Sequence, residues 1–132
     1  MAITDASGLP LSIWTTGAST HEIKLVEQTI EERFIKEKPK MIIGDQAYDS
    51  DPLDKELRKK KIHLVSPHKR NRKKMKTQDG RTLRRYCRRW KVERFFAWLQ
   101  NFRRCVTRYE YKAANYLAFV KIACVLIMTK HF

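Results

Sequence analysis

Acidic residues are scarce in this sequence. It holds 14 Asp and Glu against 29 Lys and Arg, which gives a net charge of +15 and a pI near 10.0. Because so many like charges repel one another, the composition indicates a polyanionic partner. Hydrophobic residues make up 42% of the 132 positions, which excludes a wholly disordered chain and suffices for the core of one domain.

Cysteines and signal-like patterns are also few. Cys87, Cys105 and Cys124 are odd in number and far apart, which excludes a disulfide framework and a CxxC metal site. They are typical of reduced thiols in a cytoplasmic protein. The opening residues MAITDASGLP lack the basic and apolar pattern of a signal peptide. The most apolar run, YLAFVKIACVLIMTKHF, is interrupted by Lys121, so we expect a buried helix rather than a membrane span.

The positive charge belongs to one part of the chain. Between Lys55 and Arg108 there are 21 Lys and Arg against three acids, or +18, whereas the remainder carries eight basic and eleven acidic residues, or −3. Basic runs are often no more than solvated faces, but so sharp a division favours a nucleic-acid partner. An anionic membrane surface is the weaker alternative.

The first forty residues predict a hairpin followed by a helix. Two short β-prone runs flank residues 6–8, and Gly8 suits the turn between them. Ser19 and Glu22 form a capping-box pattern for a helix that we expect to continue until Pro39. Its apolar residues recur at helical spacing: Ile23, Val26, Ile30 and Phe34.

Two further strands and a helix are expected next. MIIG, residues 41–44, is typical of a buried central strand, which places Asp45 at its C-terminal tip. Residues 49–51 offer N-caps for a short helix, DPLDKELRKKK, with Pro52 in its first turn and basic residues at its end. IHLV, residues 62–65, predicts the next strand.

The rest of the chain predicts a basic loop and two helices. Residues 66–81 lack apolar periodicity and are rich in Lys and Arg, which indicates a mobile loop. Residues 83–102 and 112–128 each follow a helical pattern. The order of hairpin, helix, strand, helix, strand, loop and two helices predicts one α/β domain over residues 1–132.

Glu93 is the one acid in RRYCRRWKVERFFAWLQNFRR, residues 84–104. On a continuous helix the core stripe consists of Val92, Phe95, Leu99 and Phe102. Glu93 lies on another face, with Tyr86, Arg89 and Gln100. Glu93 could simply pair with Arg89 or Lys91. Alternatively, Glu93 and Asp45 could together bind Mg²⁺ or Mn²⁺ for phosphodiester chemistry, because hard oxygen ligands suit these ions.

Three motifs carry a resemblance to a known family. GDQAYDS (44–50), YCRRWKVERFFAWLQNFRR (86–104) and RYE (108–110) closely resemble the C-terminal part of bacterial insertion-sequence transposases with an RNase H-like DDE domain. The likeness runs from DASGLPL to the end of the chain. It implies an RNase H-like α/β fold, a mixed sheet flanked by helices, that is incomplete at its N-terminus.

The resemblance also implies roles for individual residues. Asp45 matches the family's second catalytic aspartate and Glu93 its catalytic glutamate, and both would ligate Mg²⁺ or Mn²⁺. The supporting positions are Tyr48 beside the aspartate, and Tyr86 and Arg89 of the Tyr-Arg-Glu-Lys signature. Apart from the resemblance, Asp49 is expected to support the Asp45 loop as a cap, with catalysis as the weaker alternative. The signature lysine falls on Gln100, a departure that removes a phosphate contact.

The family's first catalytic aspartate belongs on a strand upstream of the hairpin. Asp5 is the only early candidate in this chain, and the resemblance places it at a strand end near the turn. The chain is therefore expected to hold two of three catalytic carboxylates. It would be the second reading frame of an element that makes its enzyme by frameshifting, or a truncated copy.

Basic and aromatic side chains are expected either to contact DNA or to pack in the core. The expected DNA-binding residues are Lys69, Arg70, Arg72, Lys73, Lys74, Arg81, Arg85, Arg88 and Gln100. Phe95, Phe96, Trp90 and Trp98 could stack on bases, but helical spacing favours a place in the core. His21 and His68 lack partners at metal spacing, so zinc is not expected.

The expected function is that of a transposase. It would bind element ends and target as double-stranded DNA, and within a complete enzyme it would catalyse Mg²⁺-dependent cleavage and strand transfer. Its partners would be further copies of itself or an upstream reading-frame product, in the cytoplasm at the nucleoid and with no membrane. The alternatives are a catalytically inactive DNA-binding or regulatory fragment, and a basic structural protein of ribosome type in which Glu93 only forms a salt bridge.

Overall fold

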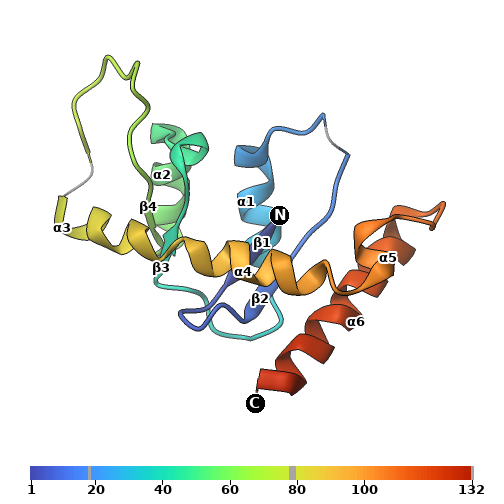
Figure 1. Ribbon diagram of the computed structural model, residues 1–132. Coiled ribbons are helices and arrows are strands. Elements are labelled where there is room, and N and C mark those ends of the chain that lie inside the picture. Colours follow the sequence, from blue (N-terminus) through green and yellow to red (C-terminus); the bar gives the residue numbers. More distant parts are fainter. Residues whose placement is uncertain (18, 78–79, 132) are drawn as a thin grey trace.

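The computed structural model describes residues 1–17, 19–77 and 80–131, which form a mixed α/β arrangement of short strands and helices (Figure 1). In chain order the elements are β1 (Ala2–Thr4), β2 (Pro10–Ile13), α1 (Glu22–Glu31), β3 (Met41–Ile43), η1 (Gln46–Tyr48), α2 (Asp51–Lys59), β4 (His63–Val65), α3 (Gly80–Leu83), η2 (Arg84–Arg88), α4 (Trp90–Leu99), α5 (Arg103–Val106) and α6 (Ala113–His131). The two η elements are 3-10 helices.

The predicted hairpin is confirmed. β1 and β2 pair antiparallel, with Ala2 opposite Ile13. The Oδ1 atom of Asp5 accepts the N–H groups of Ser7 at 2.7 Å and Leu9 at 2.9 Å, and Gly8 has a φ of +88°. Because side chains are strained at such a positive φ, glycine is the residue that suits this turn.

The two predicted strands are present and run parallel, but their place in the sheet differs from the prediction. β3 and β4 pair in parallel register, with Ile42 opposite Leu64. Within the described residues, β1–β2 and β3–β4 form two separate two-stranded sheets. All three residues of β3 are half-buried, so the expectation of a buried central strand is wrong. A strand with one paired edge stays partly exposed.

The first helix is shorter than predicted and is capped differently. His21, not Ser19, is the N-cap, and its Nδ1 atom accepts the N–H of Ile23 at 3.3 Å. The helix ends at Glu31, well before Pro39. The N–H of Phe34 donates to the carbonyl of Leu11 at 2.8 Å, so backbone pairing with β2 replaces a further helical turn.

The second helix, α2, agrees with the prediction. It begins at Asp51 with Pro52 in its first turn, and Arg58 and Lys59 lie in its last turn. Residues 66–77 form neither helix nor strand, as expected, although residues 78 and 79 lie outside the described part of the chain. The loop ends earlier than predicted, because α3 already begins at Gly80.

The expected helix over residues 83–102 is divided. η2 winds residues 84–88 as a 3-10 helix, and α4 begins only at Trp90. None of the residues of η2 is buried, so no core contact holds this segment in an α-helical turn. The last predicted helix is present as α6 and continues to His131.

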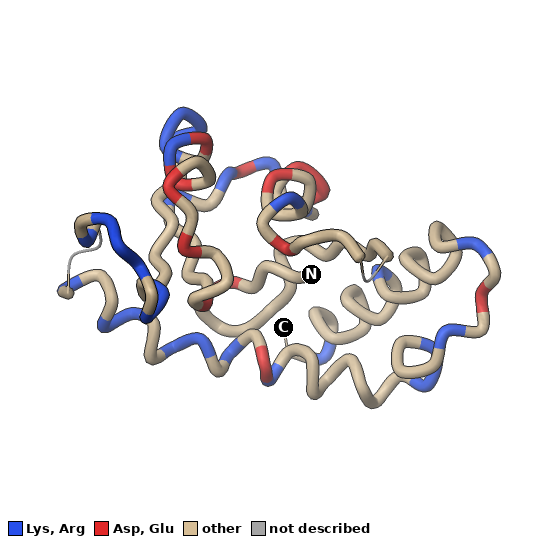
Figure 2. Tube along the Cα trace, turned by 90° about the horizontal axis from the view of Figure 1, so that it is seen from above, with Lys and Arg blue, Asp and Glu red and all other residues tan. Residues whose placement is uncertain are grey.

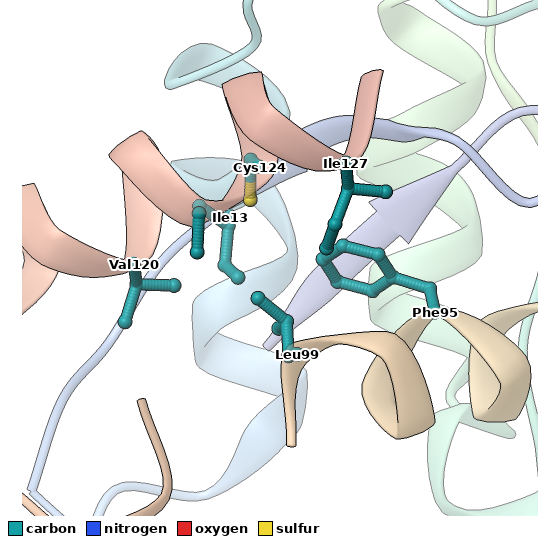
Figure 3. Close-up of a cluster of buried hydrophobic side chains, with 7 residues drawn as sticks. Ile13, Phe95, Leu99, Val120, Cys124 and Ile127 are labelled. Carbon is teal, nitrogen blue, oxygen red and sulfur yellow. The ribbon is translucent and has the colours of Figure 1, made fainter. Parts of the chain in front are cut away.

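Two apolar clusters hold the elements together. In the first, Phe95 and Leu99 of α4 face Val120, Cys124 and Ile127 of α6 (Figure 3). Burial raises the pKa of the Cys124 thiol to about 12, so this cysteine packs as a neutral apolar group. The second cluster joins α1, α2 and β4: Val26, Ile30, Leu53, Leu57, Ile62 and Leu64.

The helix α6 buries only one face. Ile122, Val125 and Leu126 are exposed on it, so the expectation of a buried helix is half right. By length and composition alone α6 could cross a membrane. Lys121, the charge that interrupts its apolar run, pairs with Glu32 at 3.1 Å beside the end of α1. This ion pair links α6 to the end of α1.

Candidate catalytic and nucleic-acid-binding site

Asp45 stands at the C-terminal tip of β3, as predicted. Its Oδ1 atom accepts the N–H of Ala47 at 2.8 Å and thereby caps η1. Gly44 precedes it, and a Cβ atom there would lie 2.8 Å from the ring of Tyr48. The chain can therefore fold back over this glycine only because it has no side chain. The result is a half-buried carboxylate at the end of a strand.

Tyr48 supports this loop from the core side. Its ring packs over Gly44 and against the cluster of α1 and α2. Burial raises the pKa of the Tyr48 hydroxyl strongly, with further contributions from the charge and hydrogen bond of Glu22 and from the charge of Asp45. The Tyr48 hydroxyl is therefore neutral, and it lies near Glu22, a neighbour that the sequence pattern did not indicate.

Glu93 and the two supporting residues of its motif do lie together. The Oε1 atom of Glu93 is 2.6 Å from Nη2 of Arg89, and the Arg89 guanidinium lies 5.8 Å from the ring centroid of Tyr86. The simple pairing expected for Glu93 is thus present. The Glu93 side chain is nevertheless 57% exposed, so its carboxylate remains accessible.

The hairpin turn anchors α4. Lys91 donates from Nζ to the carbonyl of Ala6, and Arg94 donates from Nη2 to the carbonyl of Ser7. A Cβ atom on Gly8 would meet Arg94 at 3.0 Å and the Lys91 carbonyl at 3.2 Å. Because these atoms of α4 come so close to the turn, the position requires glycine for steric reasons as well as for its φ. Neither Lys91 nor Arg94 belongs to a sequence pattern that indicates this role.

Asp5 lies at the strand end where the resemblance placed it. Its Oδ1 atom accepts the two backbone N–H groups that close the hairpin turn. This arrangement is a turn cap of the kind that Asp side chains commonly form. The geometry therefore accounts for Asp5 structurally, without a metal ion.

No complete metal-binding group is present among the described residues. Across residues 1–17, 19–77 and 80–131, no group of three or more His, Cys, Asp or Glu side chains is placed to hold a metal ion. Asp45 and Glu93 are hard oxygen donors of the type that Mg²⁺ prefers, and they lie on different elements. Two carboxylates fit a contribution to such a site rather than a complete one.

Lys and Arg residues concentrate on the loop that follows β4 and along α3, η2 and the start of α4 (Figure 2). Arg81, Arg85, Arg88 and Gln100 of the expected DNA-binding set are exposed. Arg85 also reaches back to the sulfur of Met41 at 3.1 Å, which ties η2 to β3. Arg85 therefore lies beside the first residue of β3, whereas Asp45 follows the other end of that strand.

The cations of the loop that follows β4 differ in their surroundings. Lys69, Arg70, Lys73 and Lys74 are exposed. Arg72 differs, because its Nη1 atom lies 2.9 Å from Asp49 and its Nη2 atom 2.7 Å from Asp51, with only 11% of the side chain exposed. Arg72 is engaged by acids rather than presented to phosphate. Asp49 holds this loop, whereas we expected it to cap the loop of Asp45.

The aromatic residues of α4 divide between core and surface. Phe95 is fully buried and Trp98 is half-buried, as expected, but Trp90 and Phe96 are exposed, so the assignment of all four to the core is wrong. The Arg94 guanidinium lies 4.9 Å from the ring centroids of both Trp90 and Trp98. The spacing of Trp90, Arg94 and Trp98 by four residues was the available signal for this stack.

Comparison with known proteins identifies the family. The sequence profile described as "Transposase DDE domain" matches residues 1–128. The chain belongs to this transposase family. A protein named as a transposase for insertion sequence element IS402, from Burkholderia cepacia, is 34% identical to this transposase domain over 133 residues. That alignment covers 95% of the chain and 59% of the relative, so the domain spans about three-fifths of the relative's length. No solved structure matches the chain.

Proposed function

We propose that this domain is the C-terminal part of an insertion-sequence transposase with an RNase H-like architecture. The observation that carries the proposal is the family match across residues 1–128, on a chain that has Asp45 and Glu93 in the two motifs of its resemblance. The excess of +15 charge supports double-stranded DNA as its substrate. In a complete enzyme the domain cleaves element ends and joins them to target DNA.

Asp45 and Glu93 would contribute two carboxylates to a Mg²⁺ (or Mn²⁺) site that further ligands complete. Such ions activate a water molecule or a 3′ hydroxyl and stabilise the leaving oxygen of a phosphodiester. Arg89 orients the Glu93 carboxylate through the 2.6 Å ion pair, and Tyr86 supports Arg89. The exposed cations of the loop and of η2 bind the DNA backbone. The enzyme acts at the nucleoid as a homo-oligomer or together with an upstream reading-frame product.

The test measures Mg²⁺-dependent nicking of duplex DNA that carries the element's ends. The protein used is this chain extended by the residues encoded upstream of it. Asp45→Asn and Glu93→Gln are expected to lower cleavage at least about a hundredfold, because loss of a ligand should exceed the roughly 10- to 100-fold cost of losing a ligand's hydrogen-bond partner. Glu56→Gln, an equal charge change at an exposed site on α2, is the matched control. Cleavage that survives both Asp45→Asn and Glu93→Gln would contradict the assignment.

A noncatalytic DNA-binding or regulatory module is the second candidate. The observation that favours it is that the described residues hold no complete metal-binding group. This candidate predicts DNA binding that is unchanged when EDTA removes divalent ions, and no nicking by the chain alone. If the chain alone nicks DNA and Asp5→Asn abolishes the activity, then Asp5 is the third acid.

A further inference from the structure

The carboxylate of Asp49 is the centre of a set of bonds to the basic loop. Its Oδ1 atom accepts hydrogen bonds from Nδ1 of His68 and Nη1 of Arg72, both at 2.9 Å, and its Oδ2 atom accepts the N–H of Lys69 at 2.8 Å. The Asp49 side chain is only 6% exposed. These partners lie 19 to 23 residues further along the chain.

The partners of Asp49 bind the loop in turn. Nε2 of His68 accepts the N–H of Thr77 at 3.0 Å, which leaves the proton on Nδ1 for the bond to Asp49. Arg72 donates from Nε and Nη2 to the carbonyl of Met75 at 3.3 and 3.2 Å. We call Asp49, His68 and Arg72 the loop clamp. Through these three side chains, most of the loop is folded around one carboxylate.

Asp51 extends the clamp at the start of α2. Its Oδ1 atom lies 2.7 Å from Nη2 of Arg72, and its Oδ2 atom lies 3.3 Å from Nζ of Lys74. The Arg72 guanidinium therefore bridges the two carboxylates, with one terminal nitrogen of its planar fork on each. A side chain used in this way has few donors left for a phosphate.

The clamp gives order to a segment that would otherwise lack it. Residues 66–77 contain no helix or strand, and their positive charges repel one another. Ordering such a backbone costs conformational entropy, which charge-assisted hydrogen bonds offset. Burial alone would raise the pKa of Asp49, but the bonds from Lys69 and His68 and the positive charge of Arg72 lower it, so the carboxylate is ionised.

We propose that Asp49 is a positioning residue for DNA: the loop clamp presents Lys69, Arg70 and Lys73 outward as one preorganised phosphate-binding surface, while Arg72 serves the clamp. This inference rests on the proposed function, because it assumes that the domain binds DNA. Preorganisation strengthens binding by removing the entropy cost of ordering the loop on contact. Backbone phosphates are the partners that such a cation surface fits.

The deciding variant is Asp49→Asn, because simple electrostatics and the clamp predict opposite results. Loss of a negative charge should tighten DNA binding if only net charge matters. The clamp predicts weaker binding, by about tenfold, which corresponds to about 1.4 kcal/mol. Fluorescence anisotropy with a labelled duplex measures the dissociation constant, and Glu56→Gln, with the same charge change, is expected to bind equally or slightly more tightly.

The salt dependence gives a second measurement on the same proteins. Each phosphate contact that is lost lowers the slope of log K against log salt by about 0.9. Asp49→Asn is expected to show a shallower slope than wild type, whereas Glu56→Gln keeps the wild-type slope. Wild-type protein that does not bind DNA would overturn the proposed function and this inference together. If wild type binds and Asp49→Asn binds as tightly as Glu56→Gln, the inference alone is wrong.

Trypsin cleavage tests the clamp without DNA. Trypsin cuts after Lys and Arg, so the loop is rich in sites, and the clamp predicts slow cutting in wild type and at least about tenfold faster cutting in Asp49→Asn, since opening governs access. Circular dichroism and thermal melting show whether the variant is folded. If Asp49→Asn does not fold, His68→Phe takes its place, because it removes the Nδ1 donor of the clamp. It is expected to show the same effects. Equal cutting of wild type and a folded clamp variant would overturn the inference.

Discussion

Asp49 and Glu93 are both acids paired with an arginine, but their surroundings are opposite. The Asp49 side chain is 6% exposed and receives bonds from three loop residues, whereas Glu93 is 57% exposed and pairs with Arg89 on the turn before it. A carboxylate with so many protein partners is committed to structure. One with a single exposed partner is free to exchange that partner for a metal ion or a substrate group.

The elements that carry the two acids are also stabilised differently. α4 is anchored by the burial of Phe95 and Leu99, so the position of Glu93 depends on apolar packing. The loop clamp depends on hydrogen bonds and ion pairs that the pH and the salt concentration alter. Changes to the core and to the clamp should therefore differ in size and in their response to solution conditions.

The largest effect is expected for Phe95→Ala. This ring is fully buried between α4 and α6, and its removal should lower the free energy of unfolding by about 3 to 5 kcal/mol, because a cavity forms. Urea denaturation measures the change. Phe96→Ala, at the exposed neighbour, should cost far less. Equal effects of the two variants would mean that apolar packing does not hold α4.

A smaller loss is expected for Asp49→Ala. It leaves the part-buried donors of His68 and Arg72 without their acceptor, which should cost about 1 to 3 kcal/mol. Urea denaturation again gives the value, and Glu56→Ala on the exposed side of α2 should change stability little. If Asp49→Ala is as stable as wild type, the clamp adds nothing to the folded state.

The contribution of Asp49 should also disappear in acid. Because its folded pKa lies below the ordinary value, Asp49 stabilises the folded state fully above that value and loses this contribution as the pH falls through the folded pKa. The stability difference between wild type and Asp49→Asn should therefore be constant near neutral pH and shrink below about pH 4. Unfolding curves at a series of pH values give this difference. A stability difference between the two proteins that widens in acid would contradict the lowered pKa of Asp49.

The smallest effect is expected for Glu93→Gln. The pair with Arg89 is exposed and four residues apart on one helix, so the loss should be below about 0.5 kcal/mol. Added salt should reduce even this difference, because mobile ions screen exposed charges. A loss as large as that of Asp49→Ala would show that Glu93 is a structural residue, and the contrast between the two acids would not hold.

Local features of the fold could be read from the sequence. Gly8 indicated the turn of the hairpin, Pro52 the start of α2, and the spacing of Arg89 and Glu93 their ion pair. Asp45 is at the strand tip where the pattern placed it. In each case the residues that interact are at most a few positions apart, so propensity and spacing determine the outcome.

Other features depended on partners far along the chain. The first helix stops at Glu31 because Phe34 pairs with Leu11, and the predicted helix over residues 83–102 is divided where its side chains reach no core. Helical spacing does not report which turns find a packing partner. The exposure of Trp90 and Phe96 follows from the same limit, since only one face of α4 meets α6.

The sequence by itself determined that this chain is basic, mixed α/β and equipped with the Asp45 and Glu93 motifs of a transposase. Only the tertiary structure decided what the remaining charges do. Asp49 appeared to belong with Asp45, four residues before it, but it binds His68 and Arg72, which lie 19 and 23 residues away. From its charge alone, Arg72 is expected to bind DNA with the other cations. The fold instead places it between two carboxylates. The reason is that a charge acts on whatever lies within a few ångströms, and only folding brings those partners together.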